Sequence, residues 1–148
     1  MESDIVDQDE ARFGFRRIEA RHGKLLLNGG EIYLTGFNRH EDSAQRDMAT
    51  DLDRVRRDLQ EIKSAGANFV RLCHYPHHPG ELNLCDELGL LSMAEIPLYW
   101  WDGSQPEATM DAARRQLDKL IEHDSNHPAL VFWSVGNENR EDRPEVAK

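Results

Sequence analysis

The sequence predicts an α/β fold in which four strands alternate with three helices, after a small antiparallel β-hairpin. Strand-like runs that are apolar on both faces alternate with segments whose apolar residues recur every three or four positions. Buried strands separated by helices are typical of a parallel sheet with right-handed crossovers. With 148 residues, 39% of them hydrophobic, the chain is long enough for one globular domain of this kind.

The first part of the chain predicts the hairpin. Residues 13–20 (FGFRRIEA) and 24–34 (KLLLNGGEIYL) read as strands separated by Arg21-His22-Gly23, and Asn28-Gly29 supplies a second tight turn. Residues 31–38 (EIYLTGFN) are expected to form the first strand of the parallel sheet.

The middle of the chain predicts a helix, a strand, a short helix and a strand. The first helix spans residues 50–65, with Thr50 as its N-cap and Gly66 after its end. Its apolar stripe consists of Leu52, Val55, Leu59 and Ile62. The next three elements are expected at residues 68–75 (NFVRLCHY), 80–89 (GELNLCDELG) and 90–97 (LLSMAEIP).

The last part predicts a third helix and a fourth strand. The helix stripe consists of Met110, Ala113, Leu117, Leu120 and Ile121. His127-Pro128 ends this segment, and residues 129–136 (ALVFWSVG) form the strand.

The charge of the chain limits its partners. A formal net charge of −10, with no Lys/Arg cluster to offset it, repels phosphate backbones and anionic lipid. No apolar run approaches the roughly eighteen residues needed to cross a bilayer. We therefore expect neither a nucleic-acid nor a membrane partner. Residues 1–12 are acidic and lack the pattern of a signal peptide, which predicts a disordered lead and a cytoplasmic protein.

The strand ends distinguish two architectures. A doubly wound sheet that binds a nucleotide is expected to carry GxGxxG after its first strand, and this sequence does not. In a (β/α)₈ barrel, polar residues gather at the C-terminal ends of the strands. All four predicted strands end this way, in Asn38, Arg39 and His40, in Arg71 and His74, in Glu95, and in Asn137 and Glu138. The sequence therefore predicts a half-barrel, (βα)₃β, with a site at this rim.

Glu138 follows a run that is apolar almost without a break. We expect it to point into a cleft where loss of water favours the protonated carboxyl, which suits a general acid.

Several longer stretches together resemble one enzyme family. They include LNGGEIYLTGFNRHED, NFVRLCHYPHHP and HDSNHPALVFWSVGNEN, and the resemblance covers roughly residues 13 to 140. The sequence is similar to the catalytic TIM barrel of glycoside hydrolase family 2, the β-galactosidase and β-glucuronidase group. The resemblance implies a retaining glycosidase that acts on a carbohydrate β-glycoside.

The resemblance also implies individual roles. Glu138 matches the general acid/base, and Asn137 matches the residue that bonds the sugar 2-hydroxyl. His40 and His74 match sugar-contacting positions, and Arg71 matches the arginine that steadies the nucleophile. Trp100 and Trp101 are candidates for a surface on which a sugar stacks.

The sequence departs from the family in two respects. The nucleophile is expected after the seventh strand, so residues 13–148 correspond to the N-terminal half of the barrel, truncated after strand four. Galactosidase-like members carry a Glu-x-His magnesium pair where this sequence has Tyr99-Trp100-Trp101. The sequence therefore predicts no metal and no cofactor, and it weakens the expectation of a galactoside substrate.

The roles of several residues stay open. Glu138 could instead be a structural carboxylate paired with Arg71, and Glu95 could replace the nucleophile, although a salt bridge with Arg71 is simpler. The three histidines of HYPHHP are as close in sequence as metal ligands often are, but their spacing is not that of a known zinc site. Cys73 and Cys85 form no CxxC and are expected to be buried, reduced thiols.

Two other function classes compete with the glycosidase. A half-barrel could bind sugar weakly without turnover. It could also assemble, because its two sheet edges and apolar inner face need a cover, either as a homodimer or with a complementing second half-barrel.

Overall fold

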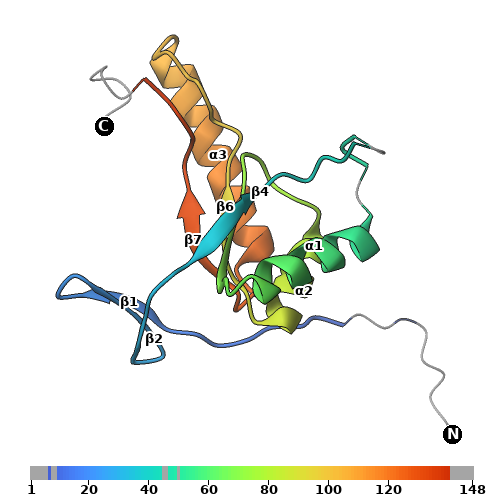
Figure 1. The fold of residues 1–148 in the computed structure, drawn as a ribbon. Coiled ribbons are helices and arrows are strands. Elements are labelled where there is room, and N and C mark those ends of the chain that lie inside the picture. The colour runs from blue at the N-terminus through green and yellow to red at the C-terminus, as the bar shows by residue number, and fades with distance from the viewer. Residues whose placement is uncertain (1–6, 8–9, 45–46, 50, 141–148) are drawn as a thin grey trace, which may run out of the picture.

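The computed structural model describes residues 7, 10–44, 47–49 and 51–140. In that part of the chain, a three-stranded antiparallel sheet precedes a four-stranded parallel sheet whose crossovers contain three helices (Figure 1). The predicted α/β fold, a partial (β/α)₈ barrel with an N-terminal hairpin, is confirmed. No helix among these residues is long and apolar enough to cross a membrane.

The small sheet is an antiparallel meander of β1 (Ile18–Arg21), β2 (Lys24–Leu27) and β3 (Gly30–Ile32). Asn28 and Gly29 have φ angles of 51° and 84°. Two consecutive positive φ angles match the twist of a two-residue hairpin, so the predicted turn is confirmed. In Figure 1 this sheet (blue) projects away from the helices.

The parallel sheet has the order β4-β5-β6-β7. Its strands are β4 (Gly36–Arg39), β5 (Phe69–Leu72), β6 (Leu91–Glu95) and β7 (Leu130–Ser134). Each strand pairs in parallel with the next strand in sequence. All four C-terminal ends therefore meet at one rim, as in the barrel architecture.

The crossover helices are α1 (Leu52–Ser64), α2 (Pro79–Leu88) and α3 (Pro106–Asp124). The Asp51 side chain caps α1 by accepting hydrogen bonds from two backbone N–H groups of the first turn. Gly89 ends α2 in the left-handed conformation, as the sequence predicts.

Several predicted element boundaries differ from the observed ones, three of them in the N-terminal part of the fold. Asp51 is the N-cap of α1 rather than Thr50, which lies outside the described residues. Residues 13–17 precede β1 without being part of it. Residues 31–38 are divided between β3 and β4, because the Asn68 side chain accepts a bond from the Thr35 N–H and donates one to the Tyr33 carbonyl. These bonds satisfy backbone groups outside either sheet.

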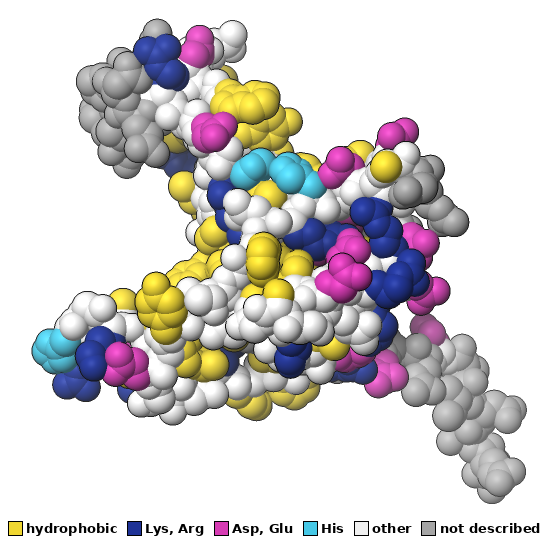
Figure 2. Space-filling model, viewed as in Figure 1, with side chains coloured by type: hydrophobic (Ala, Val, Ile, Leu, Met, Phe, Trp, Pro, Cys, Tyr) yellow, Lys and Arg dark blue, Asp and Glu magenta, His cyan; other side chains and the backbone are white. Residues whose placement is uncertain are grey.

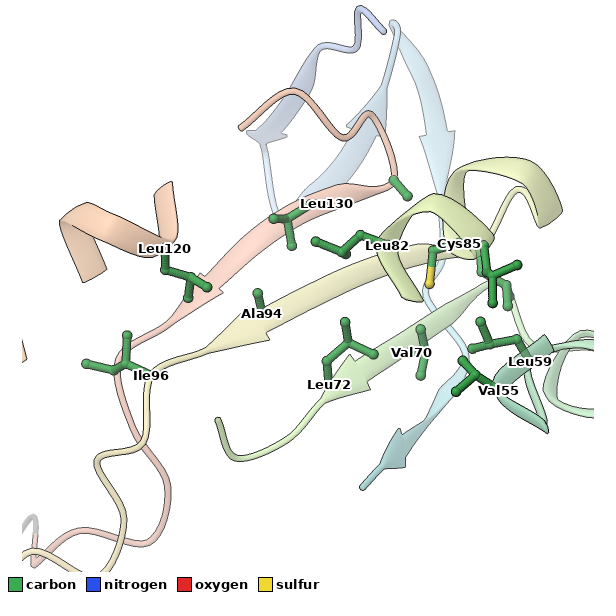
Figure 3. Packing of buried hydrophobic residues seen from close by; sticks show 13 residues of the cluster. Val55, Leu59, Val70, Leu72, Leu82, Cys85, Ala94, Ile96, Leu120 and Leu130 are labelled. Carbon is green, nitrogen blue, oxygen red and sulfur yellow. The ribbon is translucent and has the colours of Figure 1, made fainter. Parts of the chain in front are cut away.

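The helices cover one face of the parallel sheet through a single hydrophobic cluster. Figure 3 shows Val55 and Leu59 of α1 packed near Val70 of β5, while Leu120 of α3 approaches Ile96. Burying a side chain of this size contributes about 1.5–3 kcal/mol relative to exposing it. The apolar stripes predicted for α1 and α3 face the sheet, with two exceptions. Leu52 is 40% exposed and Ile121 is 37% exposed.

The opposite face of the sheet is less covered. Phe69, Met93 and Phe132 lie on it and are half-buried. The rings of Phe69 and Phe132 meet edge to face at a centroid distance of 6.1 Å. Among the described residues, the hydrophobic cluster formed with the helices does not include these three side chains, so this face corresponds to the inside of the barrel.

Candidate active site

The C-terminal rim of the parallel sheet surrounds a cavity of about 510 Å³. The predicted site residues line it, except for Trp101. The lining consists of Asn38, His40, Arg71, His74, Tyr75, Tyr99, Trp100, Asn137 and Glu138. Side chains that are up to 100 positions apart in sequence therefore share one polar cavity, because the parallel strands bring their ends together.

Glu95, at the end of β6, is the buried centre of this rim. Its Oε2 accepts hydrogen bonds from Arg71 Nε at 2.9 Å, Arg71 Nη2 at 2.5 Å and Ser134 Oγ at 2.6 Å. Its Oε1 lies 2.6 Å from Nδ1 of His74. The predicted salt bridge between Glu95 and Arg71 is confirmed. Burial acts to raise the pKa of Glu95, but these hydrogen bonds outweigh it and leave the pKa below its usual value.

Arg71 links this buried carboxylate to Asn137. Its Nη2 donates to Oδ1 of Asn137 at 2.9 Å. Because the amide oxygen of Asn137 faces Arg71, the amide NH₂ is the group that remains to donate to a ligand in the cavity.

Glu138 lines the cavity but is exposed to solvent. The prediction that its carboxyl group is shielded from water is therefore wrong for the described residues. Its Oε2 accepts a hydrogen bond from Nε1 of Trp100 at 2.6 Å. The alternative in which Arg71 pairs with Glu138 is not what the structure shows, since Arg71 contacts Glu95 and Asn137 instead.

Two strand-exit loops pair to hold Glu138. The Asn137 N–H donates to the Leu98 carbonyl at 2.9 Å, and the Trp100 N–H donates to the Asn137 carbonyl at 3.1 Å. A Cβ atom on Gly136 would lie 2.6 Å from the Leu98 oxygen, so the loops can approach this closely only with glycine there.

The two predicted histidines of the site are neighbours. The rings of His40 and His74 meet at a centroid distance of 5.2 Å and an angle of 76°. Tyr75 completes this side of the cavity, where its hydroxyl lies 3.5 Å from Nδ1 of His40 and accepts a bond from the Glu41 N–H.

The sequence analysis missed two lining residues, Tyr75 and Tyr99, as parts of the site, whereas Asn38 was predicted at this rim and lines the cavity. Tyr75 adjoins His74 in the motif after β5, and Tyr99 adjoins Trp100 after β6. Their position beside predicted site residues, at strand ends, is the signal that could have identified them.

Two residues predicted at this rim lie elsewhere. Trp101 is buried, its Nε1 donates to the Ser104 carbonyl at 2.8 Å, and it lines a separate cavity beside α3. Arg39 points to the helix side of the sheet and pairs with Glu81 at 2.9 Å. Arg39 is the last residue of β4, and neighbouring residues of a strand point to opposite sides of the sheet, so Arg39 faces the helices while His40 reaches the cavity.

The histidines of HYPHHP do not converge. His77 lies 3.0 Å from Glu81 and 3.0 Å from the Cys73 carbonyl, whereas His78 caps α2 by accepting a bond from the Gly80 N–H. The set His74, His77 and His78, considered as a metal site from the sequence, is therefore dispersed.

Comparisons with known proteins identify the family of the chain. The model of the TIM barrel domain of glycosyl hydrolases family 2 matches residues 18–147. The chain belongs to this family. The resemblance stated from the sequence motifs is therefore confirmed.

Solved structures of family 2 relatives show the same fold. An apo structure of Bacteroides uniformis β-glucuronidase 3 is 41% identical with a TM-score of 0.77, covering 84% of this chain and 16% of that chain. A Ruminococcus gnavus β-glucuronidase in complex with D-glucaro-δ-lactam is 30% identical with a TM-score of 0.82, covering 86% of this chain and 22% of that chain.

Curated family 2 relatives include a β-galactosidase of Pectobacterium atrosepticum, which is 34% identical over 145 residues. The match covers 93% of this chain and 14% of that relative. The chain therefore spans a small part of the length of the relatives it matches.

Proposed function

We propose that this chain forms the acid/base side of a retaining β-glycosidase active site that hydrolyses O-glycosidic bonds. One observation carries the proposal. Glu138, Asn137 and Arg71 share a single cavity at the C-terminal rim of a family 2 barrel domain. In such a barrel, this rim is where catalytic residues gather.

Glu138 is proposed as the general acid/base. Its carboxyl group protonates the leaving oxygen of the glycoside, and the resulting carboxylate then takes a proton from the incoming water. The Trp100 bond occupies Oε2, which leaves Oε1 to face the substrate.

The remaining cavity residues bind and orient the sugar. The NH₂ group of Asn137 donates to a sugar hydroxyl, a contact that strengthens as positive charge develops on the ring. His40 and His74 contact other hydroxyls, and the exposed indole of Trp100 offers an apolar surface to a sugar face.

We propose that the nucleophile is a carboxylate contributed from outside the described residues. In a retaining enzyme it is a second carboxylate about 5–5.5 Å from the acid. Glu95 is a poor candidate because it is fully buried and bonded to Arg71, Ser134 and His74. We propose that Glu95 instead positions Arg71.

The test compares leaving groups. The chain is assayed on 4-nitrophenyl and methyl β-glycosides, alone and with a polypeptide that supplies the last four strands of a family 2 barrel. We expect hydrolysis only in the complemented sample. Glu138→Gln should lower methyl-glycoside turnover by about 10² to 10⁴-fold and affect the activated aryl glycoside less, because that leaving group needs little protonation.

Glu122→Gln is the matched control, because Glu122 is an exposed carboxylate of α3. This variant should keep full activity. Equal losses for the two leaving groups in Glu138→Gln would contradict the acid role. Sugar binding detected by tryptophan fluorescence, without hydrolysis in any sample, would favour a binding module instead.

Self-association is a second candidate, favoured by the half-buried Phe69, Met93 and Phe132 on the inner face. A second copy could cover this apolar face. Sedimentation should then show a dimer at micromolar concentration that Phe132→Gln weakens. A compact monomer throughout this range would exclude it.

A further inference from the structure

Cys73 is a buried thiol at the rim that the proposed acid/base chemistry does not use. Its side chain is 1% exposed and belongs to no disulfide. One ligand atom each from His40, Cys73 and His74 lies within 4.8 Å of the other two. Figure 2 shows histidine side chains gathered in an exposed patch near the end of β4.

The sheet brings these three residues together. Arg39 pairs with Leu72 across β4 and β5, so the residues that follow, His40 and Cys73, leave the sheet side by side. The Cys73 N–H donates to the Arg39 carbonyl at 3.1 Å, and the thiol lies 3.3 Å from the same oxygen. The backbone therefore fixes the position of the sulfur atom.

His74 is oriented as metal-binding histidines usually are. Its Nδ1 lies 2.6 Å from Oε1 of Glu95, an ionised carboxylate that can only accept a hydrogen bond. Nδ1 therefore bears the proton, and the lone pair of Nε2 is available to a ligand. A carboxylate behind the distal nitrogen is the usual support for a histidine that binds a metal.

We propose that His40, Cys73 and His74 bind a thiophilic divalent transition-metal ion, with Zn²⁺ as the expected occupant. Two imidazole nitrogens and one thiolate are a donor set that zinc prefers, and a fourth position would face the cavity. Zinc bond lengths of about 2.0–2.3 Å bring tetrahedral ligand atoms to about 3.5 Å from one another. The remaining approach of about 1 Å requires the exposed His40 side chain to adjust its rotamer against Tyr75.

Binding requires the thiol to lose its proton. Burial raises the pKa of Cys73, while the nearby charge of Arg71 lowers it and that of Glu95 raises it. The metal ion replaces the thiol proton, so Cys73-SH and M²⁺ give the metal thiolate and one H⁺ released to solvent.

Metal and sugar would exclude each other, because both use His40 and His74. This consequence rests on the proposed glycosidase function, whereas metal binding itself does not. A bound ion would act as an inhibitor of the site.

The test uses Co²⁺ as a spectroscopic substitute for Zn²⁺. Titration of the chain should produce a near-ultraviolet thiolate-to-cobalt charge-transfer band that saturates at one equivalent and disappears when Zn²⁺ is added. Cys73→Ser should abolish the band. Cys85→Ser is the matched control, because Cys85 is also a free, buried thiol but lies on α2, and this variant should keep the band.

His40→Ala provides a second variant, since His40 is exposed and its loss leaves the core intact. It should weaken Co²⁺ binding by at least about tenfold. Absence of the band in the natural sequence, or its persistence in Cys73→Ser, would overturn the proposal. Because metal binding is measured by an absorption band, this test does not depend on whether the chain hydrolyses glycosides.

Discussion

The indole nitrogen of Trp100 donates a hydrogen bond to Oε2 of Glu138 over 2.6 Å, across two different strand-exit loops. Both residues have left-handed backbone conformations, with φ angles of 54° and 49°. Such conformations cost a non-glycine residue about 1 kcal/mol or more, so the paired loops must hold them in place. The orientation of the proposed acid therefore depends on the loop after β6 as much as on its own strand.

The Trp100 bond predicts a specific NMR change. Glu138→Ala removes the acceptor, so the indole N–H proton of Trp100 should move upfield toward the position of a water-exposed indole. The indole proton of Trp101 bonds to the Ser104 carbonyl and should stay in place, which makes it an internal control. An unchanged Trp100 resonance, or an equal shift of Trp101, would show that the two side chains do not interact in solution.

The buried Glu95 predicts acid sensitivity. Its folded-state pKa is lowered from 4.5, so its stabilising effect is present above that value and is lost as the pH falls through the lower, folded-state value. Glu95→Gln should reduce the free energy of unfolding at pH 7 by about 3 kcal/mol, because Arg71 loses its buried counter-charge. The variant should also show a flatter decline of stability below pH 4.5. Urea unfolding between pH 7 and pH 3 measures both effects.

Glu19→Gln is the control for Glu95. Its hydrogen bond to Arg17 also lowers the pKa of Glu19, but this ion pair is on the surface of the small sheet. Exposed pairs contribute little to stability. If both variants lost stability equally, burial of Glu95 would not be the cause.

The alternation of strands and helices could be predicted because buried parallel strands and amphipathic helices have different apolar periods. The break between β3 and β4 could not. It depends on bonds from the Asn68 side chain to Tyr33 and Thr35, which are 35 and 33 positions away. The local pattern of apolar residues cannot indicate a hydrogen-bond partner that is so distant in the sequence.

The rim itself could also be predicted, since the ends of parallel strands must meet. Which side chains turn into the cavity could not. Arg39 precedes His40, and Trp101 follows Trp100, yet only His40 and Trp100 reach the cavity. For Arg39 and His40 the choice depends on where β4 ends, because an error of one residue reverses the predicted face, whereas Trp100 and Trp101 lie in the loop after β6.

The ion pair between Arg39 and Glu81 predicts strong energetic coupling. Both side chains are buried, and Nη1 of Arg39 lies 2.9 Å from the carboxylate. Arg39→Met should lower the free energy of unfolding by about 3–5 kcal/mol, because the Glu81 charge is then buried without its main partner. Adding Glu81→Leu should recover part of this loss.

The exposed pair of Arg56 and Glu87, 2.8 Å apart, provides the comparison cycle. Its coupling energy should stay below about 1 kcal/mol. Additive losses in the Arg39 and Glu81 cycle would mean that the two side chains stabilise the fold independently. Urea unfolding of the single and double variants gives both coupling energies.

Gly136 predicts how tightly the two rim loops must pack. A Cβ atom there would lie 2.4 Å from Nδ2 of Asn139 and 2.6 Å from the Leu98 oxygen, so Gly136→Ala must push the loops apart. Overpacking of this kind costs about 1–3 kcal/mol, which corresponds to at least roughly fivefold faster hydrogen exchange at the Asn137 and Trp100 amides if opening is local.

Gly30→Ala is the matched control for Gly136, because a Cβ atom on Gly30 of β3 meets only the Leu27 oxygen at an ordinary 3.5 Å. Exchange at the rim should be unchanged in this variant. Faster exchange in Gly136→Ala alone would locate the strain at the loops that position Glu138. Equal exchange in both variants would mean that the loops accept a methyl group, and that Glu138 is held by its Trp100 bond rather than by close backbone packing.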